Sequence, residues 1–386
     1  MTVLCFPALA IAAPKPDVVW STILNVPVYN PLQSSDGLVY LTSLQAGGPN
    51  VFAIDDTTGK LIWSFATKGS IAIPPTVGDT QLFIASDVGD THFMRAINSK
   101  TGALIWEYTR DQPPQCMCSY QSKLTGGLLF AQTDGHSLFA FQPQGAAPSR
   151  RLWSFAGDGA LLTSPVTADD VVVIGSADRN VYGLDTKTGK ILWRQTTGYA
   201  FTADPVVIDD VVVIGDQGGN MDGFALKTGK LLWSTTANGP IDDTAVLKGK
   251  TAFFVSEDHN IYALNVMSGQ VNWQYTMDDF AAFPPVVSGD LVVVDNRAGN
   301  LIALNTSNGK NVWQVNLNGT PFSAPLLWDA RKAVVLKIGD HEISAFSLSS
   351  GENIWQYNSK AVVTSPIAVG KTVDFATSQG DVTGLY

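Results

Sequence analysis

Charged residues, cysteines and long apolar runs are all scarce in this sequence. Charged side chains make up only 15% of the 386 residues, and 34 acidic residues against 24 basic ones give a net charge of −10. Because no cluster of Lys and Arg interrupts this acidity, we do not expect a nucleic acid as a partner. Beyond the first residues, no stretch approaches the roughly 18 apolar residues that a membrane-spanning helix requires, so we expect no membrane span.

The three cysteines do not indicate a disulfide framework. Cys116 and Cys118 stand two residues apart. On an extended segment both side chains would point to one face, where a mutual disulfide would be strained. We therefore expect two free thiols at these positions.

Residues 1–13 form an apolar segment without a charged side chain, and the segment ends in Ala10-x-Ala12 before Pro14. This composition is typical of a secretory signal peptide, although the usual basic start is missing, and a buried N-terminal strand is the alternative. We expect the signal, and with it a secreted protein, or a periplasmic one in a bacterium. Asn305 and Asn318 begin glycosylation sequons, which predict a glycoprotein if the source is a eukaryote.

Tryptophan, in contrast, recurs with a regular period. Nine of the ten tryptophans follow one another at intervals of 40 to 47 residues, and they are Trp20, Trp63, Trp106, Trp153, Trp193, Trp233, Trp273, Trp313 and Trp355. Periods of this size are typical of a β-propeller, in which each repeat forms one four-stranded blade. Because blades share one axis, we expect residues 14–386 to form a single all-β domain.

The repeat that ends at Trp193 shows the expected blade. Short apolar runs at 163–166, 171–176, 180–185 and 190–193 alternate with turn residues, which predicts four strands. A glycine four residues before the tryptophan suits a hairpin that needs a positive φ. An Ala or Gly ten residues before the tryptophan leaves room for the indole to lie on the sheet and dock one blade on the next.

These positions combine into the pattern Ala-x-Asp-x-x-Thr-Gly-x-x-x-Trp, seen in full from Ala53 to Trp63. The pattern resembles the tryptophan-docking motif of the PQQ-like repeat. That family includes the quinoprotein alcohol dehydrogenases and the outer-membrane barrel-assembly lipoprotein of bacteria. The resemblance runs from about Trp20 to Tyr386, and its recurrence makes it specific for the fold and not for a function.

Counting the repeats gives nine blades. Eight complete repeats end at Trp63 through Trp355, and three further strand-like segments follow at 364–367, 372–376 and 381–386. Residues 18–23 can supply the missing fourth strand and close the ring, which removes an exposed sheet edge. Eight blades remain the alternative, because propellers commonly have four to eight and the third repeat carries insertions at 111–114 and 142–148.

The segment before the innermost strand of each blade is apolar in nearly every repeat. A loop that faces water should not be apolar in every repeat. We therefore interpret these residues as an apolar funnel that binds a hydrophobic small molecule. The alternative is that they only pack the channel. We expect the following residues to contact this small molecule: Tyr29, Ile71, Ile73, Met117, Leu161, Tyr199, Phe201, Ile241, Phe280, Phe283, Phe322 and Val362.

Two adjacent carboxylates interrupt this apolar ring. Asp242 and Asp243 stand where other repeats have apolar residues. Beside apolar walls one of them could have a raised pKa and serve as an acid or hydrogen-bond donor, which makes the pair the candidate catalytic residues. The alternative is an ordinary solvated turn.

Three functions are compatible with these features. The first is a cofactor-free enzyme of natural-product metabolism, of the cyclisation or cycloaddition type, in which the funnel positions an apolar substrate. The second is a non-enzymatic scaffold with a protein partner, similar to the barrel-assembly lipoprotein. The third, a PQQ-dependent dehydrogenase, is less favoured: that family's adjacent cysteines are interrupted here by Met117, and no calcium set can be placed. We therefore expect no cofactor, and neither PQQ nor calcium.

Overall fold

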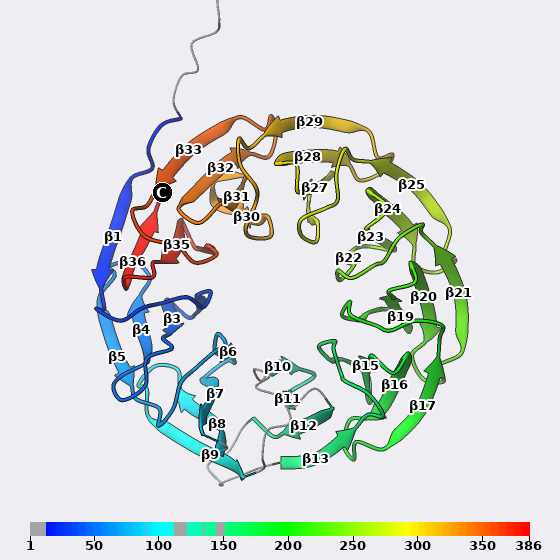
Figure 1. Cartoon of the computed structure of the whole chain (residues 1–386), viewed down its shortest axis with the longest axis horizontal. Coiled ribbons are helices and arrows are strands. Elements are labelled where there is room, and N and C mark those ends of the chain that lie inside the picture. The colour runs from blue at the N-terminus through cyan, green and yellow to red at the C-terminus, as the bar shows by residue number, and fades with distance from the viewer. Residues whose placement is uncertain (1–12, 90, 112–121, 134–135, 144–150) are drawn as a thin grey trace, which may run out of the picture.

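The computed structural model describes residues 13–89, 91–111, 122–133, 136–143 and 151–386. Across these residues the chain forms nine four-stranded antiparallel sheets arranged as a ring around a central opening (Figure 1). No α-helix occurs in this part of the chain, whose one helical element is the 3₁₀ turn η1 (Asp329–Arg331). The prediction of nine blades is therefore confirmed.

The first five blades follow one another along the chain. The first consists of β2 (Gln33–Ser35), β3 (Leu38–Thr42), β4 (Val51–Asp55) and β5 (Leu61–Phe65), and the second of β6 (Thr76–Val77), β7 (Gln81–Val88), β8 (Thr91–Asn98) and β9 (Leu104–Asp111). The third consists of β10 (Ser122–Thr125), β11 (Leu128–Thr133), β12 (Ser137–Phe141) and β13 (Arg151–Ala156). The fourth consists of β14 (Val166–Ala168), β15 (Val171–Gly175), β16 (Asn180–Asp185) and β17 (Ile191–Thr196), and the fifth of β18 (Val206–Ile208), β19 (Val211–Gly215), β20 (Asn220–Ala225) and β21 (Leu231–Thr236).

The last four blades continue the same order. The sixth consists of β22 (Val246–Lys248), β23 (Thr251–Ser256), β24 (Asn260–Asn265) and β25 (Val271–Thr276), and the seventh of β26 (Val286–Ser288), β27 (Leu291–Asp295), β28 (Asn300–Asn305) and β29 (Asn311–Asn316). The eighth consists of β30 (Leu326–Trp328), β31 (Ala333–Ile338), β32 (Glu342–Ser347) and β33 (Asn353–Asn358). The ninth joins β34 (Ile367–Val369), β35 (Thr372–Ala376) and β36 (Asp381–Leu385) to β1 (Val18–Ile23).

The N-terminal strand closes the ring, as predicted. β1 pairs antiparallel with β36, and Trp20 lies opposite Gly384. Backbone hydrogen bonds extend the pairing beyond both strands, because Asp17 and Tyr386 exchange N–H···O contacts at 3.1 and 2.9 Å. Each blade thus begins at the channel and ends at the circumference, and the ninth blade takes its outermost strand from the other end of the chain.

Tryptophans of the outermost strands dock blades on their successors. In seven places within the described residues the indole N–H of the outermost strand donates to a backbone carbonyl in the last hairpin of the next blade, at 2.7 to 2.9 Å. The hairpin glycine makes this possible: Gly189 has φ +67°, and a Cβ there would lie 2.5 Å from Trp153 Cε3. The buried apolar side chains form nine clusters, and each cluster is shared by two neighbouring blades.

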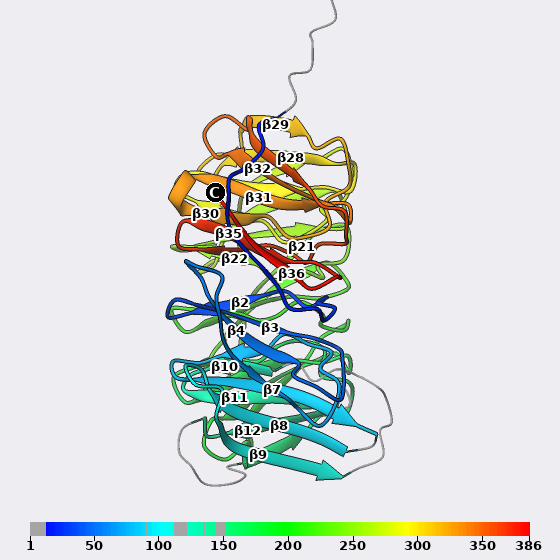
Figure 2. The ribbon, with the colours of Figure 1, turned by 90° about the vertical axis from the view of Figure 1, so that its left-hand side faces the viewer.

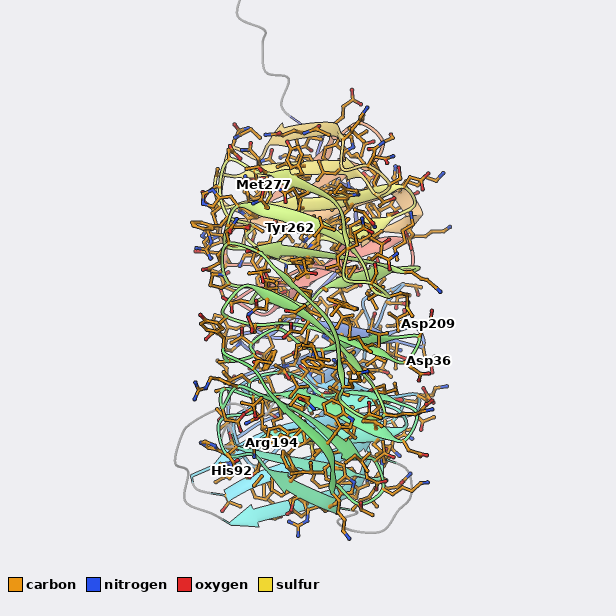
Figure 3. All side chains as sticks on the ribbon, turned by 90° about the vertical axis from the view of Figure 1, so that its right-hand side faces the viewer. Asp36, His92, Arg194, Asp209, Tyr262 and Met277 are labelled. Carbon is orange, nitrogen blue, oxygen red and sulfur yellow. The ribbon has the colours of Figure 1, made fainter. Side chains whose placement is uncertain are left out.

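The ring has two different faces, seen from the rim in Figure 2. Turns between the first and second strands of a blade lie on one face, where Figure 3 shows Asp36 and Asp209. The opposite face carries the loops that lead from one blade to the next and the turns between second and third strands, and there Figure 3 shows Met277 and His92. We call this second surface the inter-blade face, because it carries the loops that contain the predicted site residues of the described part.

Several expectations concern residues outside the described ranges. These are residues 1–12 of the predicted signal, Cys116 and Cys118, and most of both insertions of the third repeat. Within the described part, no helix is long and apolar enough to cross a membrane.

Candidate functional site

Four of the predicted funnel residues are buried between blades, so a ligand cannot contact them. They are Ile71, Leu161, Phe201 and Ile241, each no more than 3% exposed. For two of them the preceding blade makes room with a glycine: a Cβ at Gly215 would lie 2.4 Å from Ile241 Cγ2, and one at Gly175 would lie 2.7 Å from Phe201 Cβ. Their apolar character in repeat after repeat therefore comes from blade packing, the alternative that the sequence left open.

Other predicted residues do reach the solvent on the inter-blade face. Tyr29 is 54% exposed, Tyr199 53% and Phe322 50%, and Leu162, which was not among the predicted contacts, is 47% exposed. They come from the loops that enter the first, fifth, eighth and fourth blades. Ile73, Phe280, Phe283 and Val362 are partly exposed, whereas Met117 lies outside the described residues.

The predicted catalytic pair lies in a cleft of about 220 Å³ between the sixth and seventh blades. We call it the acidic cleft, and it is lined by Pro240, Asp242, Asp243, Val255, Ser256, Glu257, Phe280, Ala281, Ala282 and Arg297. Two backbone hydrogen bonds of 2.9 Å shape it, from Glu257 N to Pro240 O and from Arg297 N to Phe280 O. The fold therefore holds two inter-blade loops against two strand turns and brings Asp242, Asp243 and Phe280 together.

The two carboxylates of the pair have different surroundings. Asp242 is exposed and accepts a hydrogen bond from Thr202 Oγ1 at 2.5 Å. Burial raises the pKa of the half-buried Asp243, the negative charges of Asp242 and Glu257 add to the rise, and the guanidinium of Arg297 opposes it. Two carboxyl groups with different proton affinities can divide acid and base roles between them.

Phe280 forms the aromatic wall of the acidic cleft. The guanidinium of Arg297 lies 5.6 Å from the Phe280 ring centroid, within the range of a cation–π contact. The ring of His259 meets Phe280 edge to face with centroids 4.2 Å apart. The site thus combines an apolar surface with carboxylates and one cation.

Sequence reasoning missed Glu257, Arg297 and a neighbouring buried acid, Asp295. Asp295 is fully buried, and neither carboxyl oxygen has a hydrogen-bond partner among the described residues. Burial raises the pKa of Asp295 well above its ordinary value, and the charge of Asp243 adds to the effect. The signal was available in the sequence, because Asp295 occupies the strand position that is Gly175 and Gly215 in earlier repeats.

A second pocket, of about 620 Å³, lies on the inner wall of the channel. It is lined by Gln33, Ile73, Pro74, Pro75, Thr76, Val77, Ser122, Lys123, Leu124, Ser164 and Asp204. Asp204 Oδ1 accepts a hydrogen bond from Ser164 N at 2.6 Å, and Asp204 Oδ2 lies 3.8 Å from Lys123 Nζ. The channel wall here is of mixed polarity, and Ile73 is the only predicted contact in its lining.

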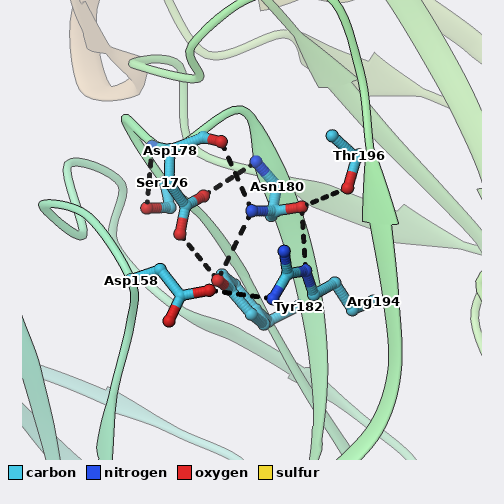
Figure 4. A network of polar contacts seen from close by, with 7 residues as sticks. All are labelled: Asp158, Ser176, Asp178, Asn180, Tyr182, Arg194 and Thr196. Atoms are coloured by element: carbon cyan, nitrogen blue, oxygen red, sulfur yellow. Dashed lines mark hydrogen bonds and ion pairs between the residues drawn. The ribbon is translucent and has the colours of Figure 1, made fainter.

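Other polar groups on the inter-blade face have a structural role. In the fourth blade, Asp178 accepts hydrogen bonds from Tyr182 Oη at 2.6 Å and from Asn180 N at 2.9 Å (Figure 4). Burial works against ionisation of Asp178, but these bonds lower its pKa, and burial together with Asp178 raises the pKa of Tyr182 to about 12. The sixth blade repeats the arrangement with Asp258 and Tyr262, so the network stabilises a hairpin.

Within the described residues, no group of three or more His, Cys, Asp or Glu side chains is placed to hold a metal ion.

A closed ring of nine four-stranded blades, in which seven indoles dock a blade on the last hairpin of its successor, defines a PQQ-like repeat propeller. The family model described as "Outer membrane protein assembly factor BamB" matches residues 9–148, 145–282 and 257–386. The chain therefore belongs to this family.

Individual relatives are more distant. A tetrathionate hydrolase of Acidithiobacillus ferrooxidans is 27% identical over 44% of this chain and 34% of its own length, and the assembly factor BamB of Shewanella oneidensis is 24% identical over 36% of this chain and 37% of its own length. The chain thus spans about a third of the length of the curated relatives that it matches. The crystal structure of BamB from Moraxella catarrhalis shares the fold, with a TM-score of 0.61, 17% identity and coverage of 96% of this chain and 99% of that one.

Proposed function

We propose that this propeller is a protein-binding scaffold that holds its partner with the inter-blade face. One observation carries the proposal: Tyr29, Leu162, Tyr199 and Phe322, each about half exposed, extend from the loops of four blades around the ring. A small molecule cannot contact residues on such separate sectors at once, whereas a protein surface can. Large apolar and aromatic side chains of this kind are typical anchors of protein interfaces.

The family description supports the same function, because it names an assembly factor of outer-membrane proteins. It also supports our expectation of a secreted or periplasmic location, which remains a proposal here. Charge indicates which partner surface would fit: the acidic cleft presents Asp242, Asp243 and Glu257 against one cation, Arg297. A partner with basic side chains facing the sixth and seventh blades would be attracted and oriented.

Site-specific photo-crosslinking in cells of the source organism tests the scaffold. A photoreactive amino acid replaces Tyr199 or Phe322 on the inter-blade face, and in matched controls it replaces Ile191 or Leu231, which are equally exposed on outermost strands. We expect a discrete protein adduct from the first two positions and none from the controls. Adducts of equal yield from all four positions, or from the controls alone, would contradict the proposal.

A second candidate function is the cofactor-free enzyme, and the acidic cleft is the observation that favours it. The raised pKa of Asp243 beside the ring of Phe280 suits a general acid or a hydrogen-bond donor to an apolar substrate. The cleft would repel a dianion such as tetrathionate. At about 220 Å³ it is also smaller than the roughly 300 to 1,000 Å³ of most ligand sites, which is why we rank the scaffold first.

Binding of a neutral apolar dye, Nile red, tests this second candidate. We expect its fluorescence to rise on addition of the protein and the rise to be lost in Phe280→Ala. Phe322→Ala, on a separate sector, is the matched control and should retain the rise. Equal binding by the two variants would remove the acidic cleft as an apolar site.

A further inference from the structure

The two ends of the chain meet in the ninth blade, where β1 and β36 are joined by strand pairing and not by a hairpin. β1 contacts β36 through backbone hydrogen bonds, and Leu24 N donates to Gly380 O at 2.9 Å just beyond the strand. Trp20 then docks this blade on the first, with its indole N–H 2.8 Å from Asp56 O. We call this pairing and docking together the seam.

Each blade contains a row of three residues that leads from the second strand to the docking tryptophan. In the sixth blade the row is Phe253, Ala263 and Trp273, paired across three strands. The second-strand member is apolar or aromatic in eight blades, where it is at most 1% exposed: Tyr40, Phe83, Phe130, Val173, Val213, Phe253, Val293 and Val335. At the seam the row is Asp374, Gly384 and Trp20, so a carboxyl group takes the apolar position.

Asp374 has little polar compensation for its burial: within the described part of the chain, only the nearby Thr372 hydroxyl lowers its pKa. It is fully buried, and neither of its oxygens has a hydrogen-bond partner among the described residues. Its carboxyl lies beside the indole that closes the ring, because a Cβ built on Gly384 would come within 2.9 Å of Asp374 Oδ1 and 2.6 Å of Trp20 Nε1. A buried carboxylate without partners is costly unless it is protonated or exposed to water.

Among the described residues, no positive charge contributes to the pKa of Asp374. Within its own sheet, Asp374 pairs with Ile367 of β34 and Gly384 of β36, and Gly384 pairs with Trp20 of β1. The charged group of the first blade that affects the pKa of Asp374 is Asp56. Burial raises the pKa of Asp374 to about 7, the nearby Thr372 hydroxyl opposes the rise, and Asp56 adds to it.

We propose that the protonation state of Asp374 controls whether the seam is closed. The protonated carboxyl lets β1 stay paired with β36, and its ionisation favours release of β1 from β36. We call this device the latch. Release lets water reach the carboxylate and separates it from Asp56. The direction follows from linkage: the closed seam binds the proton more tightly than the open one, in which the carboxyl is solvated and has an ordinary pKa near 3.8. Opening therefore becomes easier as the pH rises from about 4 to about 7, and changes little above that range.

Hydrogen–deuterium exchange of the full chain tests the latch. Exchange is measured at about pH 5 and about pH 8, corrected for the intrinsic pH dependence, and read for β1, β36 and, as an internal reference, β17. We expect protection of β1 and β36 to fall about tenfold or more between the two pH values, with β17 unchanged. In Asp374→Val and in the isosteric Asp374→Asn the fall should disappear.

Asp295→Val is the matched control, because Asp295 in the seventh blade, away from the seam, is an equally buried carboxyl whose oxygens have no hydrogen-bond partner in the part of the chain that the structure describes. It should leave the response of β1 intact. The proposal is overturned if β1 protection does not depend on pH, if Asp374→Asn keeps the full response, or if Asp295→Val removes it. The last result would mean that β1 only reports global unfolding.

Discussion

The indole of Trp328 meets the indole of Trp355 edge to face, with ring centroids 6.0 Å apart. Seven other docking tryptophans donate to a hairpin of the next blade, but Trp355 faces the ninth blade, where the chain termini replace that hairpin. Trp355 Nε1 accordingly has no hydrogen-bond partner among the described residues. Trp328, the tenth tryptophan that does not fit the repeat, packs in this region, and its ring lies 6.0 Å from that of Tyr386.

Replacing Trp328 by Ala should therefore weaken the ring beside its seam. Trp328 is fully buried, and large-to-small changes of a buried aromatic residue cost about 3 to 5 kcal/mol of unfolding free energy. Urea unfolding followed by tryptophan fluorescence measures the loss.

Trp328→Phe is the control for this experiment, because it keeps an aromatic ring against Trp355 and loses no hydrogen bond: Trp328 Nε1 has no partner among the described residues. We expect it to lose clearly less than Trp328→Ala. Equal losses in the two variants would mean that ring packing is not what Trp328 contributes.

Two Gly→Ala substitutions can distinguish the stability cost of a left-handed backbone from the cost of a steric clash with a docking indole. Gly189 and Gly249 both have positive φ, +67° and +55°, but a Cβ at Gly189 would lie 2.5 Å from Trp153 whereas one at Gly249 would meet nothing within 4 Å. Gly249→Ala should cost about 1 kcal/mol through the left-handed backbone alone. Gly189→Ala should cost about 3 kcal/mol or more, because the indole must also move. Thermal unfolding of both variants measures the difference, and similar costs would contradict docking by close contact.

The fold was predictable because its determinants are local and repeated. Each docking tryptophan, its hairpin glycine and its small partner stand at fixed spacings, so the number of blades and closure by residues 18–23 followed from counting. The inter-blade loops have no such period. Sequence alone could not tell that Ile241 is buried against the sixth and fifth blades while the next residue, Asp242, is exposed. Asp295 escaped notice because it ends a strand of valines, and its isolation depends on the blades around it.

The buried acid of the fifth blade, Asp222, should give the stability a measurable pH dependence. Burial raises its pKa to about 6, the Ser234 hydroxyl lowers it and the charge of Asp216 adds to the rise. The folded pKa lies above the unfolded value of 3.8, so the folded state loses stability as the pH rises from about 4 to about 6, by at most about 3 kcal/mol.

Asp222→Asn isolates this contribution from those of other acids. Relative to the parent protein, the variant should gain stability as the pH rises through that interval and keep the gain at neutral pH. Urea midpoints at a series of pH values measure it. A stability difference that stays constant with pH would show that Asp222 is not the titrating group.

The acidic cleft allows a test in which two substitutions shift one pKa in opposite directions. Asp242 raises the pKa of Asp243 and Arg297 lowers it. Asp242→Asn should therefore lower the pKa of Asp243, and Arg297→Gln should raise it, because each change removes one charge beside the same half-buried carboxyl. Both altered side chains are exposed, so the fold should tolerate the changes. Carbon-13 NMR of protein labelled at its aspartate carboxyls measures the titration, with the resonance assigned by its loss in Asp243→Asn. Shifts of the same sign in the two variants would mean that a change in the burial of Asp243, and not the charges of its neighbours, controls its proton.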